Sequence, residues 1–368
     1  MSQLPRFRTP DLSVLSDPLF WKRSDARFLM GSPIADWDYE TCKAYVHEAV
    51  HTDAPPLMDL VAANARLVFW EAELGVSNVT SFPFTVSFPL TDVCNARCAF
   101  CAYIPERVVG RNSGIQEFEK LDWLKFVNTL NLNCGLGEPL MHRDFAKIVQ
   151  FLRRTAPHLR MSLITNASKL SEANVDAVVD YFAYLKVSMN AARKETYEET
   201  MKIPWQPTID GLKLLKRRKE ETGARLPAVR LSFVLHRKNL EEIVEAPALA
   251  KELGADEITL ANMVPVQKRW SDRYDRLMDE KDVIESDMEK ALPIMRQFKE
   301  ECFRQGVHIK GAVPLIDDVD DDYEMSMEDL TFAERKKLLR GAILKRDYSA
   351  VAGIAETVAP DVVERAKA

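Results

Sequence analysis

Two hydrophobic periodicities alternate along the middle of the chain and predict an α/β domain. Short apolar stretches are followed by longer segments in which apolar residues recur every three or four positions. The short stretches predict strands at residues 84–90, 132–136, 161–165, 184–189, 228–235 and 257–261. Strands that alternate with helices are typical of parallel βα units. We therefore expect a partial (βα)6 TIM-like barrel, with its functional rim at the carboxyl ends of the strands.

The segments between these strands predict helices of ordinary length. Their apolar positions indicate helices at residues 121–130, 145–152, 175–182, 209–222, 239–254 and 281–305. Ser171 is a plausible N-cap before the third of them, and Gly223 and Gly254 are plausible ends of the fourth and fifth. The caps and the periodicity thus agree on where these helices lie.

The two ends of the chain differ in pattern from this middle part, which spans residues 82–310. Residues 1–81 have a helical character interrupted by prolines, and an apolar helix face formed by Cys42, Tyr45, Val46 and Ala49 predicts an N-terminal helical cap. Residues 311–368 begin with a run of acidic residues and continue with weakly helical segments. We interpret the acidic run as a solvated linker rather than a metal site, and the rest as a mainly helical C-terminal extension.

Charge and composition narrow the class of function. The formal net charge is −6 over 368 residues, which disfavours a nucleic-acid binder, although a local basic groove can exist within an acidic total. We find neither the apolar core of a signal peptide nor an uninterrupted apolar stretch of about 18 residues, so we expect no membrane partner and a cytoplasmic location. In that reducing compartment the 6 cysteines are free for metal binding or chemistry.

Three of these cysteines stand together directly after the first predicted strand. Cys94, Cys98 and Cys101 form a C-x3-C-x2-C spacing. Such a loop can give one thiolate to each of three irons of a [4Fe–4S] cluster and leave the fourth iron open for another ligand. Zinc normally takes four protein ligands, and the nearest histidine downstream is His142, which we expect to cap or pack at the rim. A three-cysteine zinc site remains the alternative at this point.

The cysteine segment resembles the signature of the radical S-adenosylmethionine (SAM) superfamily, in which an aromatic residue, here Phe100, commonly precedes the third cysteine. A second segment, Gly135-Leu136-Gly137-Glu138-Pro139, resembles the Gly-Gly-Glu-Pro segment of that family, with Leu136 in place of one glycine. The resemblance covers about residues 82–310. It implies that the cysteines hold a [4Fe–4S] cluster and that the cofactor SAM binds beside it. The cofactor contacts that it implies are Phe100, Gly135, Gly137, Glu138, Pro139, Thr165, Asn166, Ser188, Asn190 and Lys202.

The resemblance also implies a reaction class. Members cleave SAM with one electron, from a donor such as flavodoxin or ferredoxin, and use the 5′-deoxyadenosyl radical to remove hydrogen from a substrate carbon. We expect the substrate to be a small polar metabolite, namely a sugar, nucleoside or amino-acid derivative of a natural-product pathway. The remaining cysteines Cys42, Cys134 and Cys302 are isolated in sequence and suggest no auxiliary cluster. This favours a redox-neutral outcome, which means epimerisation, elimination, rearrangement or decarboxylation.

Several alternatives remain open from the sequence. One is modification of a ribosomally made peptide, another is dehydrogenation of an alcohol or amine, and a third is a structural metal-binding protein without activity. If the substrate radical needs a hydrogen donor, Cys134 and Cys302 are the candidate thiols. Cys302 continues an apolar helix stripe, so a packed core thiol is its more ordinary interpretation.

Overall fold

A seven-stranded parallel sheet is the centre of the computed structural model, which describes residues 37–51, 57–73, 77–101, 109–133, 137–264, 278, 280–284 and 288–310. These residues lie in one compact unit, Phe28–Val319. The strands follow one another in chain order, and each neighbouring pair is parallel. The first and last strands stand at opposite ends of this order, so within the described residues the sheet is open. The expected partial barrel is confirmed, with one strand more than predicted.

The strands agree well with the prediction except near the start. They are β1 (Thr85–Ser87), β2 (Thr129–Asn131), β3 (Arg160–Thr165), β4 (Phe182–Ser188), β5 (Ala228–Leu235), β6 (Glu257–Asn262) and β7 (His308–Lys310). The expected boundaries of β3 to β6 are confirmed within two residues. The predicted strand at 132–136 is wrong at its start, because β2 ends at Asn131 and residues 132 and 133 are not in a strand, while residues 134–136 lie outside the described residues. The sequence analysis also missed β7, since three residues with charged or polar ends give no strand signal.

The predicted helix at residues 121–130 is also wrong. The structure has a short helix α4 (Ile115–Glu119), a 3-10 turn η4 (Asp122–Phe126) and then β2. Leu124, Val127 and Leu130 are all buried, although they belong to a turn, a connection and a strand in succession. Their spacing of three therefore imitated one face of a helix while the chain crossed from the helix layer to the sheet.

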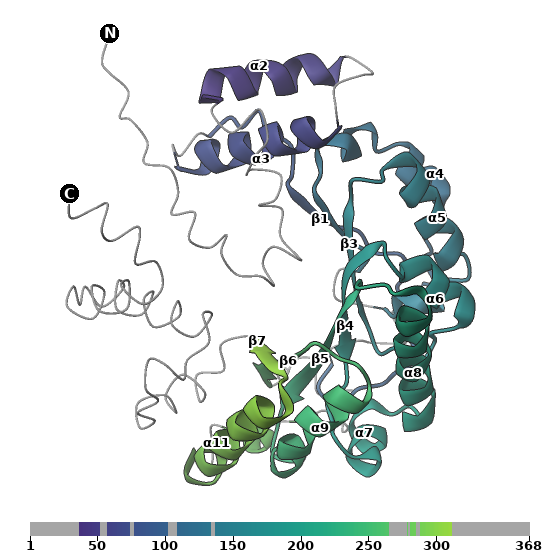
Figure 1. Cartoon of the computed structure of the whole chain (residues 1–368), viewed down its shortest axis with the longest axis vertical. Helices are drawn as coiled ribbons and strands as arrows, with labels where there is room; N and C mark the ends of the chain where they lie inside the picture. Colours follow the sequence, from purple (N-terminus) through teal and green to yellow (C-terminus); the bar gives the residue numbers. More distant parts are fainter. Residues whose placement is uncertain are drawn as a thin grey trace, which may run out of the picture. The chain divides into compact units, whose positions relative to one another are not determined.

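The remaining helices, except η5 and α7, lie where their periodicity predicts them, and Figure 1 shows α5, α6 and α8 together on one side of the sheet. Their bounds are η5 (Pro139–Met141), α5 (Phe145–Thr155), α6 (Glu172–Val178), α7 (Lys194–Met201), α8 (Trp205–Thr222), η6 (Glu241–Glu245), α9 (Ala246–Glu252), η7 (Glu280–Asp282) and α11 (Met288–Gln305). The Ser171 side chain accepts a hydrogen bond from the Asn174 amide at 3.4 Å, which confirms the cap of α6. Gly223, with φ of 67°, ends α8 as expected. Helix α6 stops at Val178, and Phe182 belongs to β4 rather than to the predicted helix.

The strands present two different faces. On one face the side chains are fully buried and pack with the helices in the main core, for example Leu130, Leu163, Leu185, Leu231 and Ile258. On the other face most alternate positions are polar, several of them half-exposed, although Ile164 and Val234 also lie there. The sheet therefore has one apolar face under the helices and one polar face.

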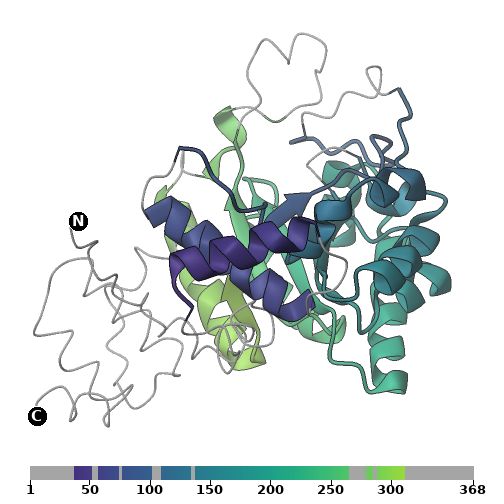
Figure 2. The ribbon, with the colours of Figure 1, turned by 90° about the horizontal axis from the view of Figure 1, so that it is seen from above.

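An N-terminal helix pair is attached at the amino ends of the first strands. Helices α2 (Tyr39–Val50) and α3 (Leu57–Glu73) lie side by side (Figure 2), and Cys42, Val46 and Ala49 are buried between them, as predicted. The Asn64 amide of α3 donates to the carbonyls of Phe82 and Phe126, both at 3.1 Å. These two residues precede β1 and β2, so α3 lies at the end of the strands opposite to the cysteine loop.

Residues 1–36 and 311–368 fall outside the described part of the chain, so the prediction of the C-terminal extension falls there as well. None of the helices in the described ranges combines the length and apolar character that crossing a membrane requires.

Candidate active site

The cysteine loop begins where β1 ends and is held by backbone hydrogen bonds. The Cys101 amide donates to the Cys98 carbonyl at 3.1 Å, which closes a tight turn between the second and third cysteine. The amides of Arg97 and Ala99 donate to the carbonyls of Met201 and Thr200, at 3.2 and 2.8 Å. The loop is thus fixed against the last residues of α7, a helix that the sequence analysis did not predict.

The three thiols lie close enough to influence one another. Burial, helped by the negative charges of Glu138 and Cys101, raises the pKa of Cys94 to about 11. Burial also raises the pKa of Cys98, and charge on Cys101 and Cys94 adds to this effect. Iron binds the thiolate form, so a metal centre at this position would displace the protons that burial otherwise retains. The donor set of three neighbouring thiols therefore fits an iron–sulfur cluster.

The same residues do not form a site for a single ion. Across the described ranges, no three side chains of His, Cys, Asp or Glu converge as one metal ion requires. Zinc draws its sulfur ligands to about 2.3 Å from a common centre. In a [4Fe–4S] cluster each thiolate binds a different iron, so the thiols stay further apart. A cluster therefore requires less convergence of Cys94, Cys98 and Cys101 than a single zinc ion does.

A second loop, Gly137-Glu138-Pro139, contacts the first. The Glu138 amide donates to the Val93 carbonyl at 2.8 Å. Gly137 has φ of 85°, and a Cβ atom placed on it would lie 2.1 Å from the Thr91 carbonyl oxygen. Only glycine permits this close approach of the two loops. Cys134, Gly135 and Leu136, which the sequence analysis also names, lie outside the described residues.

The Glu138 carboxylate joins the ends of two strands. Its side chain is buried and accepts hydrogen bonds from the Thr165 hydroxyl at 2.5 Å, the Asn166 amide at 2.7 Å and the Leu140 amide at 3.2 Å. Burial raises the pKa of Glu138, while these hydrogen bonds act against that effect. In this structure the carboxylate of Glu138 therefore organises the loops after β2 and β3.

Asn166 extends this network to the cysteine loop. Its side-chain nitrogen donates to the side-chain oxygen of Asn95 at 2.9 Å. Its side-chain oxygen accepts from the Ser168 hydroxyl at 2.7 Å. Asn95 in turn donates to the Ser168 hydroxyl at 2.9 Å. The sequence analysis missed Asn95 and Ser168. Asn95 lies inside the cysteine motif and Ser168 follows Thr165-Asn166, and these positions could have indicated that both belong to the site.

Asn190 has a similar role after β4. It adopts φ of 56° and is buried; its side-chain oxygen accepts from the Val234 amide at 2.8 Å. Its side-chain nitrogen lies 3.2 Å from the Met201 sulfur, which is 3.5 Å from the Cys98 sulfur. Asn239, also missed, donates to the Asn190 carbonyl at 2.8 Å. Met201 thus connects the cysteine loop to the end of β4.

Two further predicted cofactor contacts lie near this connection. Ser188 is the last residue of β4 and is half-buried, directly opposite Ser232 of β5. Lys202 immediately follows Met201, ends α7 with φ of 58° and is exposed.

Phe100 packs against a histidine that the sequence analysis did not single out. The ring centroids of Phe100 and His236 are 5.9 Å apart, and His236 directly follows β5. His236 is fully buried, neither ring nitrogen has a hydrogen-bond partner in the structure, and burial lowers its pKa to about 4. The sequence around a single histidine after a strand does not indicate that its side chain is buried.

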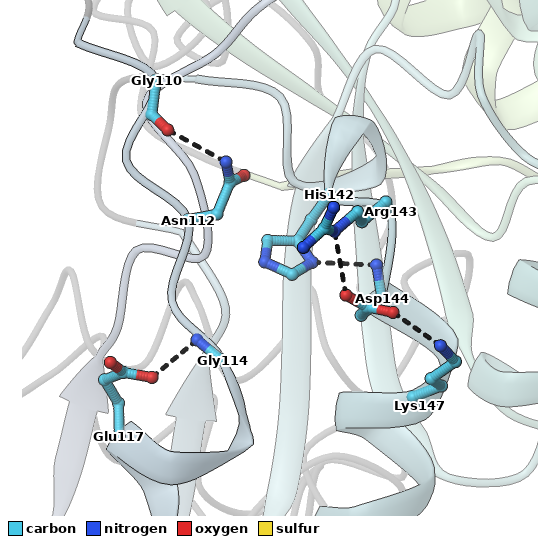
Figure 3. Close-up of polar contacts among 8 residues, drawn as sticks. All are labelled: Gly110, Asn112, Gly114, Glu117, His142, Arg143, Asp144 and Lys147. Atoms are coloured by element: carbon cyan, nitrogen blue, oxygen red, sulfur yellow. Dashed lines mark hydrogen bonds and ion pairs between the residues drawn. The ribbon is translucent and has the colours of Figure 1, made fainter.

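His142 stabilises the start of a helix. Figure 3 shows its Nδ1 atom accepting a hydrogen bond from the Asp144 amide, at 3.1 Å. The Asp144 carboxylate, next to the first turn of α5, forms an ion pair with Lys147 at 2.8 Å. Asp144 is the N-cap of α5, and His142 is buried beside it, which agrees with the expected packing rather than capping.

The two other described cysteines lie in cores. Cys42 is buried between α2 and α3. Cys302 is 2% exposed among the apolar residues of α11, and burial raises its pKa to about 12.

Comparison with known proteins agrees with this geometry. The model of the family described as the radical SAM superfamily matches residues 88–249, which include every loop described above up to α9. A protein of Saccharolobus islandicus named "Probable GTP 3′,8-cyclase" is 27% identical over 221 residues, which cover 58% of this chain and 67% of that protein. The protein of the same name in Saccharolobus solfataricus is 28% identical over 188 residues, covering 48% of this chain and 56% of that protein.

A solved structure shows the same fold at low identity. Streptococcus suis SuiB bound to S-adenosylmethionine superimposes with a TM-score of 0.53 at 16% identity, over 80% of this chain and 65% of SuiB. With an open parallel sheet, a three-thiol loop after β1 and a family model that matches residues 88–249, the chain contains a radical SAM domain. It is a radical SAM enzyme, and the cofactors of that family are a [4Fe–4S] cluster and SAM.

Proposed function

We propose that this enzyme removes a hydrogen atom from a small polar metabolite by means of SAM bound next to a cluster on Cys94, Cys98 and Cys101. The observation that carries the proposal is the meeting of this thiol loop with the Gly137-Glu138-Pro139 loop at the carboxyl edge of the sheet. The cluster, when bound, supplies the electron that converts SAM into methionine and the 5′-deoxyadenosyl radical.

The residues of the chain position the cofactor. In this proposal the backbone of residues 135–139 holds the amino group of SAM, and Ser188 and Asn190 contact its ribose and methionyl part. Lys202, exposed beside Met201, reaches the carboxylate. Glu138, Thr165 and Asn166 already bond to one another, so they keep the loops rigid, and a rigid site holds reacting atoms in register.

Two observations support the proposed class of substrate. The polar face of the sheet offers hydroxyls and amides, among them the exposed Ser87 and the half-buried Asn131. The curated relatives bear the name of an enzyme that acts on GTP, a small molecule. We propose a redox-neutral outcome, since the described cysteines outside the loop are separate core thiols, and an electron donor such as flavodoxin or ferredoxin.

Anaerobic reconstitution tests this function. The wild-type enzyme should take up iron and sulfide, turn brown and release 5′-deoxyadenosine from SAM once dithionite is added. Candidate metabolites are then screened for stimulated release, and deuterium is traced from a labelled substrate into 5′-deoxyadenosine.

The matched control compares replacement of the loop cysteines with replacement of a buried cysteine outside the loop. Joint replacement of Cys94, Cys98 and Cys101 by Ala should abolish iron uptake and SAM cleavage, whereas Cys42→Ala, a buried thiol in the N-terminal helix pair, should retain both. Colourless wild-type protein, or cleavage that persists in the triple variant, would refute the proposal.

A further inference from the structure

The polar face of the sheet is one continuous surface across neighbouring strands. The Asn131 amide donates to the Ser87 hydroxyl at 3.3 Å, and the Ser162 hydroxyl donates to the Asn131 oxygen. Side chains of β1, β2 and β3 therefore meet on the same face. The register then places Tyr184 beside Ser162, and Lys186 beside Arg230.

This face is cationic although the chain is acidic. Within the strands that the structure describes, alternation places four basic side chains there, against the single carboxylate of Glu257. The four are Arg160, Lys186, Arg230 and Lys310. The formal net charge of the whole chain is −6. A surface on which charges of one sign gather attracts ligands of the opposite sign.

Arg230 is held in a fixed orientation. Its Nε atom lies 2.6 Å from the Glu257 carboxylate, and its guanidinium carbon lies 4.1 Å from the centroid of the Tyr184 ring. Among the described residues, its two terminal nitrogens make no hydrogen bond. Stacking on Tyr184 and the contact with Glu257 thus position the guanidinium while leaving its outer donors available.

Lys186 stands next to this arginine without a counter-ion. It is half-buried and directly opposite Arg230 in the register, and the part of the chain that the structure describes gives its ammonium neither a hydrogen bond nor an ion pair. Burial and the charge of Arg230 lower the pKa of Lys186. Glu257 balances the charge of Arg230, so the Lys186 ammonium is the charge that is partly removed from water and still needs an anion.

We infer that Lys186 and Arg230, with Tyr184 beneath the guanidinium, form a subsite for a phosphoryl group of the substrate. An arginine fork and a lysine point charge suit a phosphoryl group, whose several oxygens can bridge both cations. Lys186 precedes Ser188 by two residues, so the subsite lies about 7 Å below the rim. The substrate is then oriented with its phosphoryl end inside the sheet and its reacting carbon near the cofactor. This assignment of substrate class rests on the proposed function.

Binding of inorganic pyrophosphate to the full-length, reconstituted enzyme tests the subsite independently of turnover. We expect the wild-type enzyme to bind pyrophosphate in calorimetry, with affinity that falls as sodium chloride is added. Lys186→Gln should weaken this binding about tenfold or more, because a charge-assisted contact is lost. Lys186→Arg should retain it. Lys251→Gln, an exposed lysine of α9 on the helix side, should bind pyrophosphate like the wild type.

Three results would overturn the subsite: no pyrophosphate binding by the wild type, equal affinity in Lys186→Gln, or tighter binding of citrate than of pyrophosphate. Iron content and SAM cleavage without substrate should be the same in all variants, which shows that they are folded and loaded. If these two readouts fail in the wild type, the proposed function is wrong. If only the pyrophosphate result fails, the enzyme remains a radical SAM enzyme with a different substrate class.

Discussion

Gly137 combines a left-handed backbone conformation with a close contact between the two loops of the candidate site. We predict that Gly137→Ala destabilises the protein by about 3 kcal/mol and lowers iron uptake, because its Cβ atom would collide with the Thr91 carbonyl and separate the two loops. Chemical unfolding and iron analysis measure both effects.

Gly223→Ala is the matched control for this prediction. Gly223 also has positive φ, but a Cβ atom there meets nothing within 4 Å. It should cost about 1 kcal/mol and leave iron uptake unchanged. Normal iron uptake by Gly137→Ala would show that the loops tolerate separation.

The buried His236 should make the stability of the protein depend on pH. Its folded pKa is about 4, below the ordinary value of 6.5, so its contribution to stability is complete above pH 6.5 and is lost as pH falls towards 4. Between pH 7.5 and 5.5 the wild type should lose about 1 kcal/mol through this residue.

His236→Leu and His236→Gln should both remove that part of the pH dependence, as measured by urea unfolding of cluster-free protein. The Leu variant should be at least as stable as the wild type at pH 7.5, because it replaces two buried nitrogens that lack partners. An unchanged pH profile in both variants would mean that His236 does not titrate in this range.

The sequence could predict the residues of the site whose chemistry is local. Cys94, Cys98 and Cys101 are recognisable from spacing alone. Asn95, Met201 and His236 are not, since their contacts come from segments up to about a hundred residues apart, as with the Cys98 and Met201 sulfur atoms. Such contacts depend on the assembled sheet rather than on any local pattern.

Among the secondary-structure elements, α3 is tied to the residues before β1 and β2 by the buried side chain of Asn64. Asn64 accepts from the Phe82 amide at 2.8 Å and donates to two carbonyls. We predict that Asn64→Ala destabilises the protein by about 3 kcal/mol, because three buried backbone groups lose their partner. Thermal unfolding measures the loss. SAM cleavage by the folded variant at low temperature should be retained, because α3 lies at the opposite end of the strands from the cysteine loop.

Asn174→Ala, on the surface of α6, is the control and should change stability by less than about 0.5 kcal/mol. A loss of SAM cleavage in folded Asn64→Ala would indicate that the amino ends of the strands influence the rim.

Element prediction succeeded where one pattern persisted over a whole element. The expected range of β5 is the observed one, Ala228–Leu235, and the apolar face of α5 is buried as predicted. It failed at β2, which has three residues and follows a turn with misleading spacing. Short strands are fixed by their neighbours in the sheet, and the local sequence contains little information about them.

For the molecule as a whole, the distribution of charge matters more than its sum. The formal net charge of −6 is acidic, yet four basic residues share one face of the sheet. Sequence analysis could anticipate only that a basic groove was compatible with the acidic total. Which charges gather on one face depends on strand register, because a shift by one residue would turn each of them towards the helices.

The direction of the parallel strands also indicates whether Cys302 can donate a hydrogen atom to the substrate radical. The backbone carbonyl of Cys302 accepts a hydrogen bond from the Val307 amide at 2.9 Å, just before β7, and β7 starts opposite Glu257, the first residue of β6. Cys302 therefore lies near the amino edge of the sheet, whereas the cysteine loop follows the carboxyl end of β1. We predict that Cys302→Ala lowers stability by about 1 kcal/mol and keeps full product turnover.

If Cys302 instead donated hydrogen to the substrate radical, the variant would still form 5′-deoxyadenosine but would release no reduced product. Product analysis in deuterated water, with Cys42→Ala as the matched buried thiol, separates these outcomes. Cys134→Ala measured alongside tests the other candidate thiol. Full turnover in both the Cys134 and the Cys302 variant would leave no role for a thiol at these two positions in the second hydrogen transfer, and the donor would then be another group at the rim or the 5′-deoxyadenosine itself.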